Sequence, residues 1–258
     1  AEPVIDMLFP PGKSSTIPII AITGTNGKTT TTRLIDHIFK LAGNTVGMCT
    51  TEGVYIKNRM IYQGDMTGPM SHKMVLTDPT VDLAVLECAR GGMLRAGLGF
   101  KTCDVGVVTN VSEDHLGLRG IHTVDQLARV KSIIPEIVKQ DGVTVLNADD
   151  DLVRAMSEKT KGKIIYFSLD WKNNSTVSNH LKDGETAVVF DDGWLCMMKG
   201  QWKYPIVDVK DVPLTFGGKA KFNILNALSA AGAAIGLGLK LENIKAGLVT
   251  FFPSHAQT

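Results

Sequence analysis

The sequence of 258 residues has few of the features that mark secreted, membrane or nucleic-acid-binding proteins. Its four cysteines, at positions 49, 88, 103 and 196, form no C-x-x-C pair, which argues against a disulfide framework and a zinc site. A formal net charge of +1 gives no electrostatic basis for binding nucleic acid or an anionic membrane. No apolar run approaches the roughly 18 residues of a membrane span. Free thiols without a disulfide pattern predict a protein of the reducing cytoplasm.

The most informative segment is a glycine loop at 24–29, between a β-branched apolar run at 17–23 and a helical pattern at 34–41. Strand, glycine loop and helix is the order typical of a phosphate site, because glycines let backbone N–H groups approach an anion. Lys28 would reach the terminal phosphates and Thr29 would hold Mg²⁺. The loop is shorter than the common G-x-x-x-x-G-K-[ST] pattern. A glycine-rich turn in the core is the alternative, but we favour an ATP or GTP site.

The order of the other elements predicts an α/β fold. Strand-like runs at 81–86, 104–109 and 143–146 alternate with helical segments. This order predicts a P-loop NTPase-like, mostly parallel sheet with helices on both faces and ligands at the carboxyl ends of the strands. Short strand-like runs between about 163 and 215 predict a small antiparallel β annex, with a hairpin turn at 191–193.

The two ends of the sequence predict connections to other parts of a larger protein. The chain begins at Ala1, without Met, and ends in a polar segment that completes no element. We expect residues 1–16 to be a linker from a missing N-terminal part, residues 17–250 to form the ATP-binding domain, and residues 251–258 to begin a link to a missing C-terminal domain.

Polar side chains follow two strands of the predicted sheet. Glu87 comes directly after the run 81–86, and Asp114 and His115 follow the run 104–109. We expect these two strands to be neighbours, so that their carboxyl ends bring the three side chains to one edge of the sheet. Glu87 would bind Mg²⁺, which prefers oxygen ligands, and His115 would bind a second Mg²⁺ or position the substrate. The alternatives are a solvated acid at a strand end and a structural histidine.

A predicted helix places a lysine on an apolar face. Residues 123–126 have a T-x-x-Q capping pattern, so this helix should begin near Val124. The apolar residues that share a face with Lys131 are Leu127, Ile134 and Val138. An unpaired ammonium buried there would cost on the order of several kcal/mol, and Pro135 should kink the helix. Lys131 therefore extends to solvent, meets a carboxylate, or is a neutral amine that takes up CO₂ as a carbamate.

Two amides lie one helical turn apart in an alanine-rich helical segment at 222–236. Asn223 and Asn226 both carry a donor and an acceptor, which suits the edge of a purine base. The alternative is a helix cap at Asn223 and a surface amide at Asn226.

These features resemble the central domain of the Mur ligase family, in the family's order over residues 17–240. The matching motifs are ITGTNGKTTTT at 22–32, Glu87 after a strand, Asn110 with Asp114 and His115, Lys131 in an A-x-x-K helix, NADD at 147–150, and N-x-x-N at 223–226. The resemblance implies an ATP-dependent carbon–nitrogen ligase. Such an enzyme transfers the γ-phosphoryl group to a carboxylate, and an amine then attacks the acyl phosphate.

The resemblance also implies a role for each matching residue. The phosphates would be held by Gly24, Thr25, Asn26, Gly27, Lys28, Thr29 and Thr30, and the adenine by Asn223 and Asn226. One Mg²⁺ would bind Thr29 and Glu87, and a second would bind His115 and a carbamoylated Lys131. The catalytic residues would then be Lys28, His115 and Lys131, which act by positioning and charge neutralisation.

Finer features resemble the Mur-like portion of the ligases that make cyanophycin, with archaeal pseudomurein peptide ligases as the nearest alternative. They are EPVIDMLFP at 2–10, GDMTGP at 64–69, ECARGGMLRAGL at 87–98 and FFPSHAQT at 251–258. The cyanophycin type implies a poly-aspartate (cyanophycin) chain and Arg as substrates, joined by an isopeptide bond. Arg90 and Arg95 are candidates for holding the polymer's carboxylates, although both could be plain surface arginines.

The same resemblance implies partner domains in a larger chain, an ATP-grasp domain before this segment and a C-terminal Mur domain after it, and is compatible with a homo-oligomer. We therefore expect the 258-residue piece alone to bind ATP weakly and to turn over little. The alternative from a different class of function is a nucleotide-dependent switch module, in which the loop binds but no bond forms.

Overall fold

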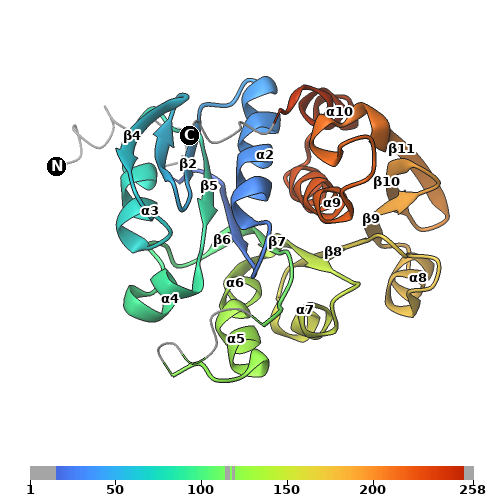
Figure 1. The fold of residues 1–258 in the computed structure, drawn as a ribbon, viewed down its shortest axis with the longest axis horizontal. Coiled ribbons are helices and arrows are strands. Elements are labelled where there is room, and N and C mark those ends of the chain that lie inside the picture. The colour runs from blue at the N-terminus through green and yellow to red at the C-terminus, as the bar shows by residue number, and fades with distance from the viewer. Residues whose placement is uncertain (1–15, 114–116, 118–119, 253–258) are drawn as a thin grey trace.

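The computed structural model describes residues 16–113, 117 and 120–252, which form one 11-stranded sheet (Figure 1). Its strand order is β11-β10-β9-β8-β7-β6-β1-β5-β2-β3-β4. The strands are β1 (Ile19–Thr23), β2 (Val46–Cys49), β3 (Gly53–Ile56), β4 (Arg59–Gln63), β5 (Leu83–Glu87), β6 (Cys103–Val108), β7 (Val138–Asn147), β8 (Lys163–Ser168), β9 (Thr186–Asp191), β10 (Trp194–Lys199) and β11 (Trp202–Asp208). The strands from β2 to β9 along this order are parallel.

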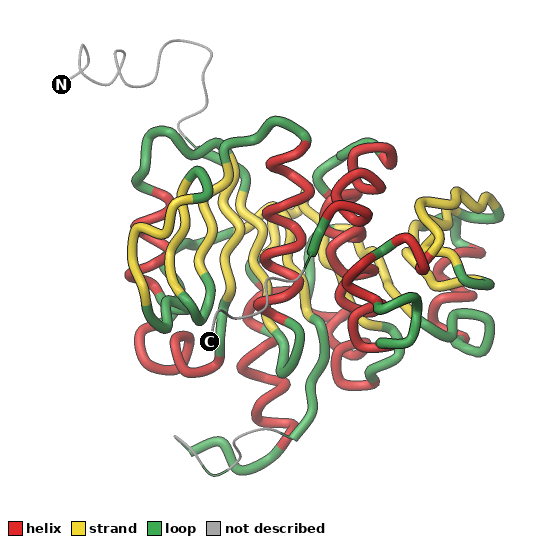
Figure 2. The backbone as a smooth tube through the Cα atoms, turned by 45° about the horizontal axis from the view of Figure 1, so that its top comes forward, coloured by secondary structure: helices red, strands yellow, loops and turns green. Residues whose placement is uncertain are grey.

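Helices cover both faces of the sheet, and Figure 2 shows helices in front of the strands. They are α2 (Lys28–Leu41), α3 (Pro69–Leu76), α4 (Arg90–Ala96), α5 (Val124–Lys131), α6 (Ile133–Glu136), α7 (Asp151–Ala155), α8 (Ser175–Lys182), α9 (Lys221–Gly236) and α10 (Leu241–Thr250). Ile20 and Ile22 of β1 pack in a core with α2, α9 and α10, whereas Ala21 packs in a core with α5 and α6. This alternation is the period of two expected of a strand buried on both faces. In the described ranges, no helix is both long and apolar enough to cross a membrane.

The expected α/β fold, with a mostly parallel sheet, is therefore confirmed, but one expected neighbour relationship is wrong. β5 and β6 do not pair with each other, because β1 lies between them and pairs in parallel with both. The glycine loop after β1 consequently lies between the carboxyl ends of β5 and β6. This order places Glu87 on one side of the loop and the residues that follow β6 on the other.

The antiparallel strand group is present, but it begins later than the 163–215 range suggests. β8 pairs in parallel with β7, and β9 pairs in parallel with β8, so both continue the main sheet. The crossover between them contains α8, which the sequence analysis did not predict. Antiparallel pairing starts between β9 and β10 at a two-residue turn, where Asp192 and Gly193 both have positive φ, as a tight hairpin requires.

The helix that carries Lys131 begins at Val124 as predicted, but Val138, which was expected on its apolar face, lies in β7. The Thr123 side chain accepts a hydrogen bond from the Gln126 N–H, and the Gln126 side chain accepts one from the Thr123 N–H. α5 ends at Lys131, and α6 continues from Ile133. Pro135 explains the break, because its ring cannot be accommodated against the carbonyl of residue 131 in a continuous helix.

Candidate nucleotide-binding site

The glycine loop between β1 and α2 requires glycine at two positions. Gly24 has φ +151° and Gly27 has φ +81°. A Cβ atom at residue 24 would lie 1.8 Å from Thr109 Oγ1, and one at residue 27 would lie 2.1 Å from Asn226 Oδ1. Backbone conformation and space therefore both exclude a side chain. These close approaches also place β6 and α9 directly against the loop.

Lysine side chains hold the first two carbonyl groups of this loop. Lys131 Nζ donates to Gly24 O at 2.6 Å, and Lys28 Nζ donates to Thr25 O at 2.8 Å. Lys131 is only 2% exposed, so the prediction that it extends to solvent is wrong. The fold brings this buried amine to the loop from α5, 107 residues away in the sequence.

The third carbonyl, that of Asn26, is held by residues that follow β6. Thr109 Oγ1 donates to Asn26 O at 2.7 Å, and Asn110 Nδ2 donates to it at 2.9 Å. Asn110 also accepts from the loop, through Oδ1 from Asn26 N–H and through its backbone oxygen from Thr25 N–H. Three consecutive loop carbonyls thus point at donors, which leaves the start of α2 to present backbone N–H groups.

The carboxylate of Glu87 lies on the other side of the loop. Thr29 Oγ1 donates to Glu87 Oε2 at 2.8 Å, and Glu87 is fully buried. Burial raises the pKa of Glu87, while the Thr29 hydroxyl, the Lys28 ammonium and the Thr51 backbone N–H oppose this rise. Among the described residues, Glu87 Oε1 has no hydrogen-bond partner. A buried carboxylate oxygen without a donor, next to a threonine hydroxyl, fits the oxygen ligand set of Mg²⁺.

A second layer of polar residues supports the end of β6. Asn147 Nδ2 donates to Thr109 O at 2.9 Å, and Asp150 Oδ2 accepts from Val111 N–H at 2.7 Å. Asp150 also caps α7 by accepting from Val153 N–H. The NADD motif therefore braces the strand end that holds the loop. The sequence analysis missed the role of Thr109, for which the only available signal is its place at the end of a strand.

A small pocket adjoins the loop on the α9 side. It is lined by Asn26, Gly27, Thr109, Asn110, Phe167, Phe222, Leu225 and Asn226. Phe222 is 66% exposed at the start of α9, and the sequence analysis did not select it. The alternative interpretation of Asn223 as a helix cap is wrong, because Ala220 occupies that position. Asn223 Nδ2 instead donates to Leu214 O, and Asn226 Nδ2 donates to Asn223 Oδ1. Of the two amides, only Asn226 lines the pocket.

The family profile described as the Mur ligase middle domain matches residues 22–234 of this sequence. The chain belongs to the Mur ligase family. Among curated proteins, it is 52% identical to the cyanophycin synthetase of Crocosphaera subtropica and 51% identical to that of a Synechocystis species, in both cases over 258 residues. The matches cover all of this chain but only 30% and 29% of those proteins.

Solved structures of Mur ligases share the fold of this chain. A UDP-N-acetylmuramoyl-L-alanyl-D-glutamate–2,6-diaminopimelate ligase matches with a TM-score of 0.68 and 20% identity, over 98% of this chain and 50% of the other. A pseudomurein peptide ligase type C from Methanothermus fervidus matches with a TM-score of 0.60 and 21% identity, over 97% of this chain and 52% of the other. At identities this low, the similarity shows a shared fold and no more.

Four other residues predicted at the site follow β5 or β6 in the chain. Asp114 and His115 lie outside the described residues. Arg90 begins α4, close after Glu87 in the chain, whereas Arg95 is exposed in the last turn of that helix. Arg90 therefore remains a candidate near the site, and Arg95 lies a helix length further along.

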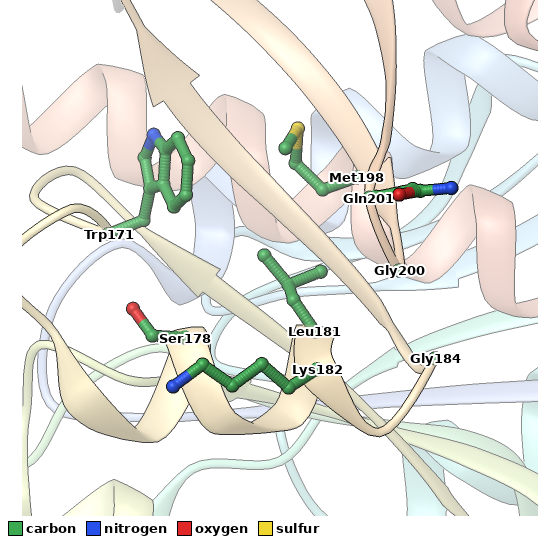
Figure 3. A pocket seen from close by; sticks show the side chains of 8 residues that line it. All are labelled: Trp171, Ser178, Leu181, Lys182, Gly184, Met198, Gly200 and Gln201. Atoms are coloured by element: carbon green, nitrogen blue, oxygen red, sulfur yellow. The ribbon is translucent and has the colours of Figure 1, made fainter.

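A larger, mainly apolar pocket of this domain, about 490 Å³ in volume, lies away from the glycine loop (Figure 3). Trp171, Leu181 and Met198 line it, between α8 and the hairpin of β10 and β11. None of the residues that line it belongs to the glycine loop or to the strand ends beside that loop. The volume of a cavity is thus no guide to the nucleotide site here.

Proposed function

We propose that this Mur ligase domain binds MgATP and is the ATP-binding domain of an amide ligase. The observation that carries the proposal is the arrangement of Thr29 and Glu87 beside a glycine loop whose first three carbonyls, those of residues 24–26, are hydrogen-bonded to side-chain donors. Backbone N–H groups at the first turn of a helix bind phosphate, and Lys28 is placed to exchange Thr25 O for a phosphate oxygen. Asn226 and Phe222 would contact the adenine, Asn226 by hydrogen bonding and Phe222 by stacking.

Magnesium would bind at Thr29 and Glu87, where it would neutralise charge on the phosphates. Lys131, with its amine beside the loop, is proposed to carry a carbamate and to hold a second ion together with His115. The residues of this chain would otherwise act by binding and orientation: the loop and Lys28 fix the γ-phosphate, and the β5 and β6 ends fix the loop.

The proposed reaction has two steps. A carboxylate oxygen of the acceptor attacks the γ-phosphorus, which forms an acyl phosphate and releases ADP. An amine then attacks the acyl carbon, which releases phosphate, and the amine loses a proton as the amide forms. The similarity to cyanophycin synthetases supports a more specific proposal, in which the acceptor is an aspartate side chain of a poly-aspartate backbone and the amine is that of Arg. Arg90 is a candidate for binding the polymer's carboxylates.

We also propose partner domains for this chain, since the relatives are about three times as long. The domain would act beside an ATP-grasp domain and a C-terminal Mur domain of one larger chain, in the cytoplasm. Assembly into a homo-oligomer is part of the same proposal.

The test is an assay of the protein with its full natural sequence. It would contain ATP, Mg²⁺, an aspartate-containing acceptor and one of Arg, Lys or Glu, and would measure ADP release and amino-acid incorporation. We expect ADP release that depends on both the acceptor and Arg, and that is lost in Lys28→Ala but kept in Lys172→Ala, a lysine near the outer end of the sheet. Incorporation of Lys or Glu alone would show that Arg is not the amino acid that is added. ATP binding without ADP release would support a switch module instead of a ligase.

A further inference from the structure

The peptide group between Asn26 and Gly27 has a fixed orientation in the loop. Its carbonyl oxygen accepts from Thr109 Oγ1 at 2.7 Å and from Asn110 Nδ2 at 2.9 Å, so it points toward the end of β6. Because a trans peptide is planar, the N–H of Gly27 must point in the opposite direction. That direction is away from the end of β6.

The opposite orientation of this peptide is open to the backbone. Gly27 has φ +81°, and glycine adopts positive and negative φ with similar ease. A rotation of the 26–27 peptide plane would exchange the directions of Asn26 O and the Gly27 N–H, so that the oxygen would face the side proposed to hold the phosphates. A carbonyl oxygen facing a phosphate is repulsive, whereas an N–H group is a ligand for it. Residue 27 must be glycine because Asn226 leaves no room for a side chain. The same glycine also allows the 26–27 peptide to rotate out of its phosphate-binding orientation.

We propose that Thr109 and Asn110 are positioning residues that hold the 26–27 peptide in its phosphate-binding orientation. Thr109 is 3% exposed and directs its hydroxyl to Asn26 O. Asn110 pairs with both polar groups of Asn26, as a neighbouring strand would: Oδ1 accepts from its N–H at 2.9 Å and Nδ2 donates to its carbonyl. The inference rests on the proposed binding of ATP at this loop, and it assigns to the two residues a role that is exerted through the loop peptide.

Two substitutions distinguish a role of the Thr109 hydroxyl from a role in packing alone, because each removes only one of the two groups on the side chain. Thr109→Val keeps the shape and removes the hydroxyl. Thr109→Ser keeps the hydroxyl and removes the methyl group. If Thr109 acts through the hydrogen bond to Asn26 O, the Val variant loses affinity and the Ser variant keeps it. If Thr109 acts only by packing, the order is reversed.

The experiment uses the protein with its full natural sequence and measures by calorimetry the Kd of the MgADP site that Lys28→Ala abolishes, so that binding to the proposed ATP-grasp domain is not counted. The thermal midpoint is measured without nucleotide. A neutral hydrogen bond corresponds to about a threefold to tenfold change, so Thr109→Val should raise Kd by that factor. Asn110→Ala, which removes two hydrogen bonds, should raise it about tenfold to a hundredfold. The matched control is Thr144→Val in β7, which also removes a buried hydroxyl, one bonded to Thr160 Oγ1 at 2.5 Å, but away from the loop.

The inference is supported if Thr109→Val and Asn110→Ala weaken ADP binding while Thr109→Ser and Thr144→Val do not, at thermal midpoints that still indicate folded protein. It is overturned if folded Thr109→Val binds ADP as the parent does, or if Thr109→Ser is weakened as much as Thr109→Val. If Thr109→Val does not fold, Asn110→Ala alone decides by the same criterion. Failure of the parent protein to show an ADP site that depends on Lys28 would instead reject the proposed function.

Discussion

The Nζ atom of Lys131 lies 2.6 Å from the carbonyl oxygen of Gly24, in an environment where the lysine is almost fully buried. A lysine from the end of α5 thereby meets the first residue of the glycine loop. The contact joins two features that the sequence analysis singled out, the lysine on an apolar helix face and the glycine loop.

Replacing Lys131 with Ala should abolish ligation in the full-length protein, with a loss of at least about a hundredfold, because the proposed carbamate would no longer hold a metal ion. Gly24 O would also lose its donor, which should lower the free energy of unfolding by about 1 to 3 kcal/mol. ADP release and chemical denaturation measure the two effects. Lys139→Ala is the control, since its ion pair with Asp104 is partly exposed and should change stability by less than about 1 kcal/mol. Near-normal turnover by Lys131→Ala would contradict the proposed role.

Glu87→Gln should separate stability from metal binding. Because burial raises the pKa of Glu87, the folded state binds its proton more tightly than the unfolded state does. The stabilising effect of that proton is present at low pH and is lost as the pH rises through the raised pKa, so the ionised carboxylate is unfavourable at pH 7. We therefore expect the Gln variant to be at least as stable as the parent in EDTA. Stabilisation by Mg²⁺ and ATP should disappear.

Thermal unfolding with EDTA, and then with Mg²⁺ and ATP, tests this prediction. Asp65→Asn is a suitable control, because Asp65 is exposed in the loop after β4 and reaches Glu87 only by its charge. A Glu87→Gln protein that Mg²⁺ and ATP still stabilise as much as the parent would exclude Glu87 as a ligand.

His72 should make the folded protein sensitive to mild acid. The ring is fully buried, accepts the Gly99 N–H through Nδ1 at 3.1 Å and lies with Nε2 3.4 Å from Glu87 O. Burial lowers the pKa of His72 to about 4, below the ordinary value of 6.5. Between these values the unfolded chain takes up a proton that the folded chain does not. Stability should therefore fall as the pH decreases from 6.5 to about 4, by roughly 3 kcal/mol at most.

Urea unfolding at pH 7 and at pH 4.5 would measure this loss. His72→Gln retains an amide able to donate to Glu87 O but has no group that titrates in this range, so its loss of stability between the two pH values should be clearly smaller. An unchanged loss in the variant would show that other groups cause the acid sensitivity.

Phe222→Ala should weaken nucleotide binding without destabilising the fold. Phe222 is 66% exposed and lines the pocket beside the loop, so the side chain is available to stack on a base. Stacking of a base on an aromatic ring contributes about 1 to 3 kcal/mol, so the Kd of ATP should rise about tenfold. Phe216→Ala is the matched control, because Phe216 is 59% exposed but does not line this pocket. Equal effects of the two substitutions on ATP binding would reject Phe222 as the adenine platform.

Features that depend on a few neighbouring residues were predictable from the sequence. The glycine loop, the cap of α5 at Thr123 and the break near Pro135 each follow from backbone preferences within one or two turns of chain. The place of Lys131 on an apolar face was predictable from helical periodicity. Its hydrogen bond to the backbone oxygen of Gly24 was not among the outcomes considered, since Gly24 is 107 residues away in sequence.

The tertiary structure alone decided which strand ends are neighbours and which polar groups meet there. Strand periodicity fixes which residues face a layer of helices, but it contains no information on strand order, so the position of β1 between β5 and β6 was not foreseen. For the same reason, the hydrogen bonds from Thr109 to Asn26 O and from Asn223 to Leu214 O could not be predicted from the sequence. The residues of the glycine loop were enough to specify its strand–loop–helix form, because local backbone geometry builds it. The tertiary structure decided which way its peptides point, because their partners come from strands and helices that only folding brings together.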